Sequence, residues 1–143
     1  MTPKSPDTPA PRVALFAGSF DPFTVGHDSI VRRALPLFDR IIIAVGTNAA
    51  KAGATPADDR VSAIRAIYAS VPGDRVRVIA YTGELTVDLA RRLGARWLLR
   101  GVRSAKDFEY ERDMADINRR IAGIETVLLY APVSYTHLRA HET

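Results

Sequence analysis

The 143-residue sequence contains no cysteine. The chain can therefore form no disulfide and no thiolate zinc site, and it has no cysteine nucleophile. It also has no apolar run near the ~18 residues that a membrane-spanning helix requires, so we expect no membrane partner. A secretory signal would need an apolar core of at least about 7 residues near the start, and none is present. The sequence thus favours a cytoplasmic location.

Aromatic side chains are few, and the charges almost balance. Aromatic residues make up 8% of the chain, and 20 Lys and Arg against 16 Asp and Glu leave a net charge of +4. Because the arginines are spread along the chain, we expect no nucleic-acid partner. The small positive excess favours anionic ligands such as phosphates, although a solvated surface explains it equally well.

The two ends of the chain differ from its middle. Residues 1–12 hold four of the nine prolines and little apolar mass, so we predict a disordered N-terminal tail. Residues 133–143, VSYTHLRAHET, show neither a helical nor a strand period. Their back-translation looks like a transposase adaptor used for sequencing libraries, and we interpret them as a non-native tail. A short native polar tail is the alternative. One domain, residues 13–132, is left, and on this interpretation its gene is cut off near Pro132.

Between the ends, short apolar runs alternate with segments of helical period. The expected strands are residues 12–17, 41–45, 76–79, 97–99 and 126–129, and the expected helical segments are residues 30–38, 58–68, 85–93 and 104–121. This alternation predicts an α/β fold with right-handed crossovers and a five-stranded parallel sheet. Ligands of such sheets bind at the carboxyl ends of the strands.

A ten-residue motif, GSFDPFTVGH at residues 18–27, follows the first expected strand. Gly18 lets the backbone approach a ligand, and Ser19 offers a hydroxyl and an amide there. His27 falls in the first turn of the next helix, where free amides and the helix dipole favour phosphate. Taken alone, His27 is more typical of a structural histidine at a helix start, whereas the whole ten-residue string favours a phosphate site.

A second motif, Arg100-Gly101-Val102-Arg103, directly follows the fourth expected strand. Two guanidinium groups at the carboxyl edge of a parallel sheet suit bidentate phosphate binding. Two surface arginines at the end of the sheet are the alternative. A third segment, DFEYE at residues 107–111, is by itself only the acidic first turn of a helix.

The helix that contains this third segment has two further expected features. Ser104 and Asp107 have the spacing of a capping box at its start. Tyr110 begins an apolar stripe and is expected in the core, together with Met114, Ile117 and Ile121.

The pattern Gly-Ser-Phe-Asp-Pro-x-Thr-x-Gly-His resembles the signature of the nucleotidylyltransferase superfamily. With the second and third motifs, the chain most resembles the bacterial phosphopantetheine adenylyltransferases. The resemblance implies a Rossmann-like, doubly wound sheet and transfer of AMP from ATP to 4′-phosphopantetheine. It also implies Mg²⁺ bound mainly through ATP, and a homohexamer. It covers residues 12–132 and lacks the end of the family's domain, where an Ile-Ser-Ser segment binds ATP phosphates.

The same resemblance implies roles for individual residues. The implied ATP-binding residues are Ser19, Phe20, His27, Gly101, Val102, Arg103 and Glu111. The implied substrate-binding residues are Ser19, Lys51, Thr86 and Arg100, and the implied catalytic residues are His27, Lys51 and Arg103. Lys51 matches imperfectly, because Asn-Ala-Ala-Lys stands where the family has Asn-Pro-x-Lys.

Two other functions remain open from the sequence. A sibling nucleotidylyltransferase, such as a nicotinate mononucleotide adenylyltransferase, shares the first motif, whereas residues 100–103 and 107–111 argue against it. An ATP-binding but inactive fragment would follow from loss of the end of the domain.

Overall fold

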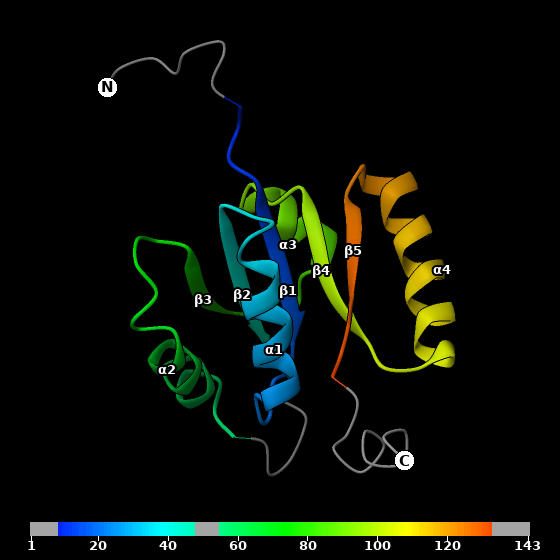
Figure 1. Ribbon diagram of the computed structural model, residues 1–143. Coiled ribbons are helices and arrows are strands. Elements are labelled where there is room, and N and C mark those ends of the chain that lie inside the picture. Colours follow the sequence, from blue (N-terminus) through cyan, green and yellow to red (C-terminus); the bar gives the residue numbers. More distant parts are fainter. Residues whose placement is uncertain (1–8, 48–54, 133–143) are drawn as a thin grey trace.

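The computed structural model describes residues 9–47 and 55–132. These residues form a single parallel sheet with the strand order β3-β2-β1-β4-β5 (Figure 1). The strands are β1 (Val13–Gly18), β2 (Arg40–Gly46), β3 (Val76–Tyr81), β4 (Trp97–Val102) and β5 (Glu125–Tyr130). The helices are α1 (Val25–Ala34), α2 (Ala57–Ile67), α3 (Thr86–Arg92) and α4 (Ala105–Ala122). The predicted α/β architecture is confirmed, whereas the segments 1–8 and 133–143 lie outside the described residues.

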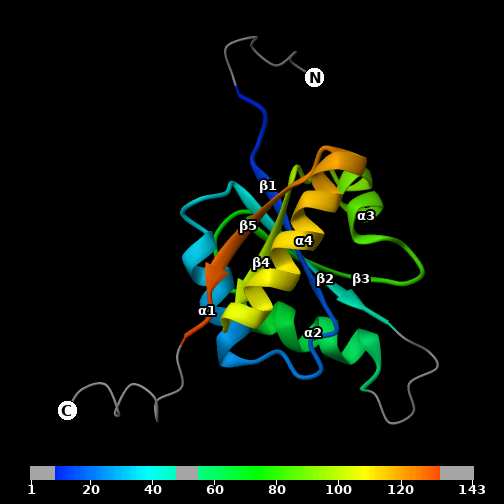
Figure 2. The ribbon, with the colours of Figure 1, turned by 90° about the vertical axis from the view of Figure 1, so that its right-hand side faces the viewer.

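Helices cover both faces of the sheet, as a doubly wound fold requires (Figures 1 and 2). Side chains of β1 alternate between the two faces: Ala14 and Phe16 pack with α1 and α2, and Leu15 packs with α3. All three are at most 4% exposed. A strand buried on both faces has a continuous apolar sequence rather than an alternating one, which is why these strands are recognisable in the sequence.

The carboxyl ends of β1 and β4 diverge. β1 pairs with β2 along its whole length but with β4 only through Ala14–Trp97 and Leu15–Leu98. The chain runs from β1 outward to β3 and then crosses back to β4, so the connections after β1 and β4 leave in opposite directions. A crevice at such a reversal of strand order is where sheets of this kind bind ligands.

Helix α1 ends earlier in the sequence than predicted. The expected segment 30–38 includes Pro36, but α1 stops at Ala34. Proline has no N–H to continue the helical hydrogen bonds, so the helix ends before it. Phe38 still packs in the core, only 6% exposed, from the connection that follows.

The prediction that the apolar stripe of α4 lies in the core is wrong. Tyr110 is 63% exposed, and the rest of this outer row of α4 is also exposed: Met114, Ile117 and Ile121. The helix instead turns Glu111, which is buried, and the half-buried Ala115 and Ala122 toward the sheet. Small alanine side chains allow close approach to the strands, so apolar periodicity alone misplaced the buried face.

The predicted capping box of α4 is half formed. Ser104 Oγ accepts a hydrogen bond from the Asp107 N–H at 3.1 Å. The Asp107 carboxylate, however, accepts from the Arg103 N–H at 3.3 Å rather than from Ser104. Asp107 therefore holds the chain that carries Arg103. None of the described helices is long and apolar enough to cross a membrane.

Thr126 provides a test of the sheet packing. Its Oγ1 is a buried side-chain atom with no hydrogen-bond partner in the described part of the chain. Thr126→Val keeps the shape and removes the unpaired hydroxyl, so the free energy of unfolding in urea should rise by about 1 kcal/mol. Thr82→Val, at an exposed site, serves as the control and should not stabilise. A less stable Thr126→Val protein would contradict the assigned burial.

Candidate active site

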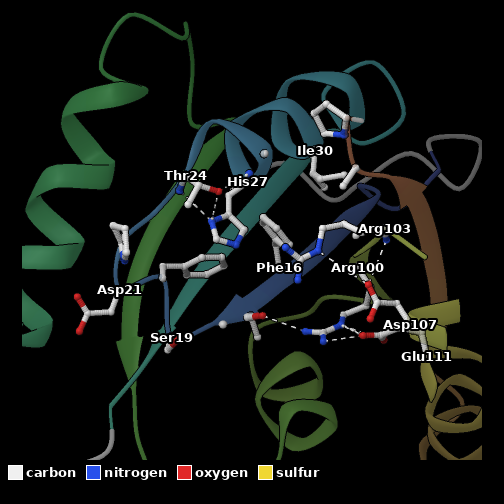
Figure 3. Close-up of a pocket in the computed structure, with 18 of the residues that line it drawn as sticks. Phe16, Ser19, Asp21, Thr24, His27, Ile30, Arg100, Arg103, Asp107 and Glu111 are labelled. Carbon is white, nitrogen blue, oxygen red and sulfur yellow. Dashed lines mark hydrogen bonds and ion pairs between the residues drawn. The ribbon is translucent and has the colours of Figure 1, made fainter. Parts of the chain in front are cut away.

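A cavity of about 720 Å³ lies at the carboxyl ends of β1 and β4 (Figure 3). Its walls come from the turn between β1 and α1, the end of β4 and the first turns of α4. Seven of the predicted site residues line it: Ser19, Phe20, His27, Arg100, Gly101, Arg103 and Glu111. Two motifs about 80 residues apart thus meet where parallel sheets bind their ligands.

Two predicted site residues that the structure describes, Val102 and Thr86, do not line this cavity. Val102 is 3% exposed, and its carbonyl accepts a hydrogen bond from the Ala131 N–H at 2.8 Å. Thr86 is the first residue of α3 and does not line the cavity. Lys51 lies outside the described residues. The roles of these three residues stay predictions.

His27 is held by the residue that caps its own helix. The His27 N–H donates to Thr24 Oγ1 at 3.3 Å, and the Thr24 N–H donates to His27 Nδ1 at 2.9 Å. This is a capping box with histidine at the position usually taken by Glu or Gln. Because Nδ1 accepts a hydrogen bond, the proton of the neutral ring is on Nε2, which is left to donate to a ligand. The role of Thr24 could have been found from its spacing to His27.

Phenylalanine rings surround the His27 ring. The ring centroids of Phe20, Phe23 and Phe16 lie 5.0, 5.4 and 6.2 Å from that of His27. Phe20 is only 4% exposed, so a ligand would meet mainly its main chain. Its φ of 48° lies in the left-handed region, which makes the turn sharp. A Cβ on Gly18 would come within 3.0 Å of the Phe20 ring, so glycine is what lets this ring fold back over β1.

The pKa of His27 lies below its ordinary value of about 6.5. Burial of the half-buried imidazole is the main cause, and the positive charge of Arg103 adds to it. The folded protein therefore holds a neutral His27 at neutral pH. The unfolded chain binds this proton more readily, so the stability that His27 contributes is present above about pH 6.5 and is lost as pH falls through its folded pKa.

We expect Arg103→Gln to raise the pKa of His27, because the nearby positive charge is removed. The pKa should stay below its ordinary value, since burial remains the larger cause. Titration of the imidazole proton signals by NMR measures this shift. Arg112→Gln, an exposed arginine on α4 outside the cavity, is the matched control and should leave the titration unchanged. An unchanged pKa in Arg103→Gln would contradict the electrostatic coupling.

Arg100 and Glu111 form a bidentate ion pair on the cavity wall (Figure 3). Arg100 Nε lies 3.1 Å from Glu111 Oε2, and Nη2 lies 2.8 Å from Oε1. Arg100 Nη1 also donates to the Ala17 carbonyl at 3.1 Å, which ties the guanidinium to β1. The hydrogen bond to Glu111 is the main cause that raises the pKa of Arg100, against the effect of burial. The guanidinium is therefore a fixed cation.

The Arg103 side chain is more exposed and less tightly held than that of Arg100. It is 81% exposed, and its Nε lies 3.9 Å from Asp107 Oδ2. His27 and Arg103 approach the same cavity from α1 and from the end of β4 (Figure 3). A neutral imidazole N–H and two guanidinium groups thus face one space, an arrangement suited to binding the oxygens of more than one phosphate.

Comparison with known proteins agrees with this geometry. The cytidylyltransferase-like family model matches residues 15–140. The phosphopantetheine adenylyltransferase of Porphyromonas gingivalis is 55% identical over 117 residues, which are 82% of this chain and 74% of that protein. The enzyme of the same name from Bacteroides fragilis is 46% identical over 125 residues, 87% of this chain and 81% of that protein.

Solved structures share the fold at low sequence identity. A bifunctional NMN adenylyltransferase/ADP ribose pyrophosphatase from Francisella tularensis matches with a TM-score of 0.63 and 16% identity, over 92% of this chain and 42% of that one. A lipopolysaccharide core biosynthesis protein from Thermoplasma volcanium matches with a TM-score of 0.62 and 14% identity, over 87% of this chain and 99% of that one. These likenesses concern the fold alone.

Proposed function

Since the chain belongs to the phosphopantetheine adenylyltransferase family and is a nucleotidyltransferase, we propose that it transfers AMP from ATP to 4′-phosphopantetheine, giving dephospho-coenzyme A and pyrophosphate. The observation that carries this proposal is the meeting of His27, Arg100 and Arg103 around one cavity at the carboxyl ends of β1 and β4. Such a site can bind the triphosphate and a second phosphate together.

The reaction requires no nucleophilic side chain. An oxygen of the 4′-phosphopantetheine phosphate attacks the α-phosphorus of ATP and forms the new P–O bond. The bond from the α-phosphorus to the oxygen that bridges to the β-phosphorus breaks, and pyrophosphate leaves with the electron pair. Because the attacking phosphate is already anionic, catalysis consists of positioning and charge stabilisation.

Each group of residues has a distinct proposed role. His27 Nε2–H and Arg103 stabilise the charge on the pentacovalent phosphorus and on the leaving pyrophosphate. Arg100 and Lys51 hold the attacking phosphate, and Ser19 contacts both substrates. Thr86 completes the proposed 4′-phosphopantetheine site. The main-chain groups of Phe20, Gly101, Val102 and Arg103, with the carboxylate of Glu111, complete the proposed ATP site.

The described residues fit a metal ion that arrives with ATP better than a protein-held one. They contain no cluster of three or more His, Cys, Asp or Glu side chains able to hold a metal. Of the carboxylates on the cavity wall, Glu111 is paired with Arg100. We propose that Mg²⁺ is bound mainly through the ATP phosphates, whose negative charge it would reduce.

The proposal extends to the assembly and the location of the enzyme. We propose that copies of the chain form a homohexamer, which the exposed apolar outer row of α4 supports because such rows are often covered by a partner. We also propose that residues 13–132 form the nucleotidyltransferase domain and that the enzyme works in the cytoplasm.

Pyrophosphate release from ATP tests the proposed reaction. We expect pyrophosphate release by this chain that depends on 4′-phosphopantetheine. Nicotinate mononucleotide in place of 4′-phosphopantetheine should give no release. Release with the mononucleotide alone would indicate a sibling activity. ATP binding without pyrophosphate release would contradict the proposal.

A further inference from the structure

Arg60 is a buried charge that does not line the cavity. It lies on α2, and only 8% of its surface is exposed. Its guanidinium donates to main-chain carbonyls: Nε to that of Thr55 at 2.9 Å, and Nη1 to those of Gly46, at 3.0 Å, and Ser19. Burying a guanidinium costs free energy unless hydrogen bonds compensate for the lost hydration. The buried position of Arg60 therefore indicates a specific role.

The three carbonyls belong to three segments near the cavity. Ser19 lies in the turn between β1 and α1, Gly46 ends β2, and Thr55 precedes α2. A second contact joins two of these segments, because the Thr55 N–H donates to the Asp21 carboxylate at 3.0 Å. Arg60 therefore holds the turn between β1 and α1 against the end of β2 and the start of α2.

Because the peptide bond is planar, the contact of Arg60 with the Ser19 carbonyl also fixes the direction of the Phe20 N–H. The Ser19 carbonyl and the Phe20 N–H belong to one peptide group, in which a trans bond makes C=O and N–H point in opposite directions. A carbonyl that accepts from Arg60 therefore turns the Phe20 N–H away from Arg60, and both Ser19 and Phe20 line the cavity. This N–H makes no hydrogen bond to the residues that the structure describes.

We propose that Arg60 is a positioning residue, which holds the Ser19–Phe20 peptide so that the Phe20 N–H is presented to an anionic ligand. Because these carbonyl partners are neutral, they do not offset the positive charge of Arg60, which adds to the attraction for anions. This inference rests on the proposed function only for the identity of the ligand, ATP. The orientation of the peptide can be tested without it.

Variants of two arginines on the same helix test the positioning role. Arg60→Met removes the guanidinium and keeps the length of the side chain. Arg65→Met is the control on the same helix, because Arg65, although exposed, also donates to a carbonyl, that of Val78 at 2.9 Å, away from the cavity. Arg60→Lys keeps the charge but not the fork that reaches three carbonyls, and it provides a folded variant if Arg60→Met does not fold.

Hydrogen exchange and steady-state kinetics are the measurements. Both Arg60 variants should speed amide exchange in residues 18–24, and kcat/KM for ATP should fall about 100-fold in Arg60→Met, as expected for a misplaced group. Arg65→Met should change neither. Guanidinium ion added to Arg60→Ala should restore part of the lost rate, because it can donate to the same carbonyls.

The outcomes distinguish this inference from the proposed function. If the wild-type enzyme releases pyrophosphate and Arg60→Met behaves as Arg65→Met does, the positioning role is wrong and the function stands. If the wild-type enzyme releases none, the proposed function fails. Exchange of residues 18–24 then decides the inference: faster exchange in the Arg60 variants alone supports it, and equal exchange overturns it.

Discussion

Replacement of His27 by alanine is expected to lower kcat for pyrophosphate release by about 10²- to 10³-fold, the usual cost of removing one donor that stabilises transition-state charge. The ring is held by Thr24 and the phenylalanines with Nε2 left to donate. Alanine removes this donor. Steady-state assays of pyrophosphate release measure the effect.

A glutamine variant separates catalysis from capping. His27→Gln places a residue common at this position of a capping box, so its side chain can still accept from the Thr24 N–H. We expect His27→Gln to unfold close to the wild-type urea concentration and to remain about as slow as His27→Ala. A wild-type rate in either variant would contradict the role given to Nε2.

Arg100→Met is expected to lower both stability and substrate affinity. Loss of the guanidinium leaves Glu111, whose side chain is 11% exposed, without its partner. Breaking a fully buried pair costs about 3–5 kcal/mol, and the 39% exposure of the Arg100 side chain reduces the expected loss to about 2 kcal/mol. The KM for 4′-phosphopantetheine should rise in the same variant, because Arg100 is proposed to hold its phosphate.

The double variant Arg100→Met/Glu111→Leu distinguishes these two effects. Replacing both charges by apolar side chains removes the unpaired carboxylate, so the free energy of unfolding should return toward the wild-type value. The high KM should remain, because the cation is still absent. Recovery of both properties would show that Arg100 serves the fold alone, and recovery of neither would contradict the burial argument for Glu111.

The local features of this fold could be predicted from the sequence because their causes are local. The strand Ile41–Val45 is apolar throughout since the structure buries it on both faces. Pro36 marks the end of the first helix through its missing N–H, although the predicted end was a few residues late. The spacing within residues 18–27 also placed His27 correctly in the first turn of α1, because a helix start depends on a few neighbouring residues.

Pairings between distant segments could not be predicted, because they depend on how the elements pack. The acid at 111 looked like a helix-dipole residue, but the orientation of α4 makes it the partner of Arg100. Tyr110 looked like core, but the same orientation exposes it. The contacts of Arg60 could not be predicted either, since its carbonyl partners are main-chain groups that every residue has.

The sequence by itself determined the parallel sheet, the helix starts and the residues able to bind phosphate, because propensity, periodicity and short motifs act over a few residues. Only the tertiary structure decided which of these charged side chains face the cavity and which form contacts within the protein. Arg103 extends over the cavity, Arg100 is shared with Glu111, and Arg60 is turned inward. The physical reason is that burial and partners set what a charge can do, and both arise from segments that meet only when the chain folds.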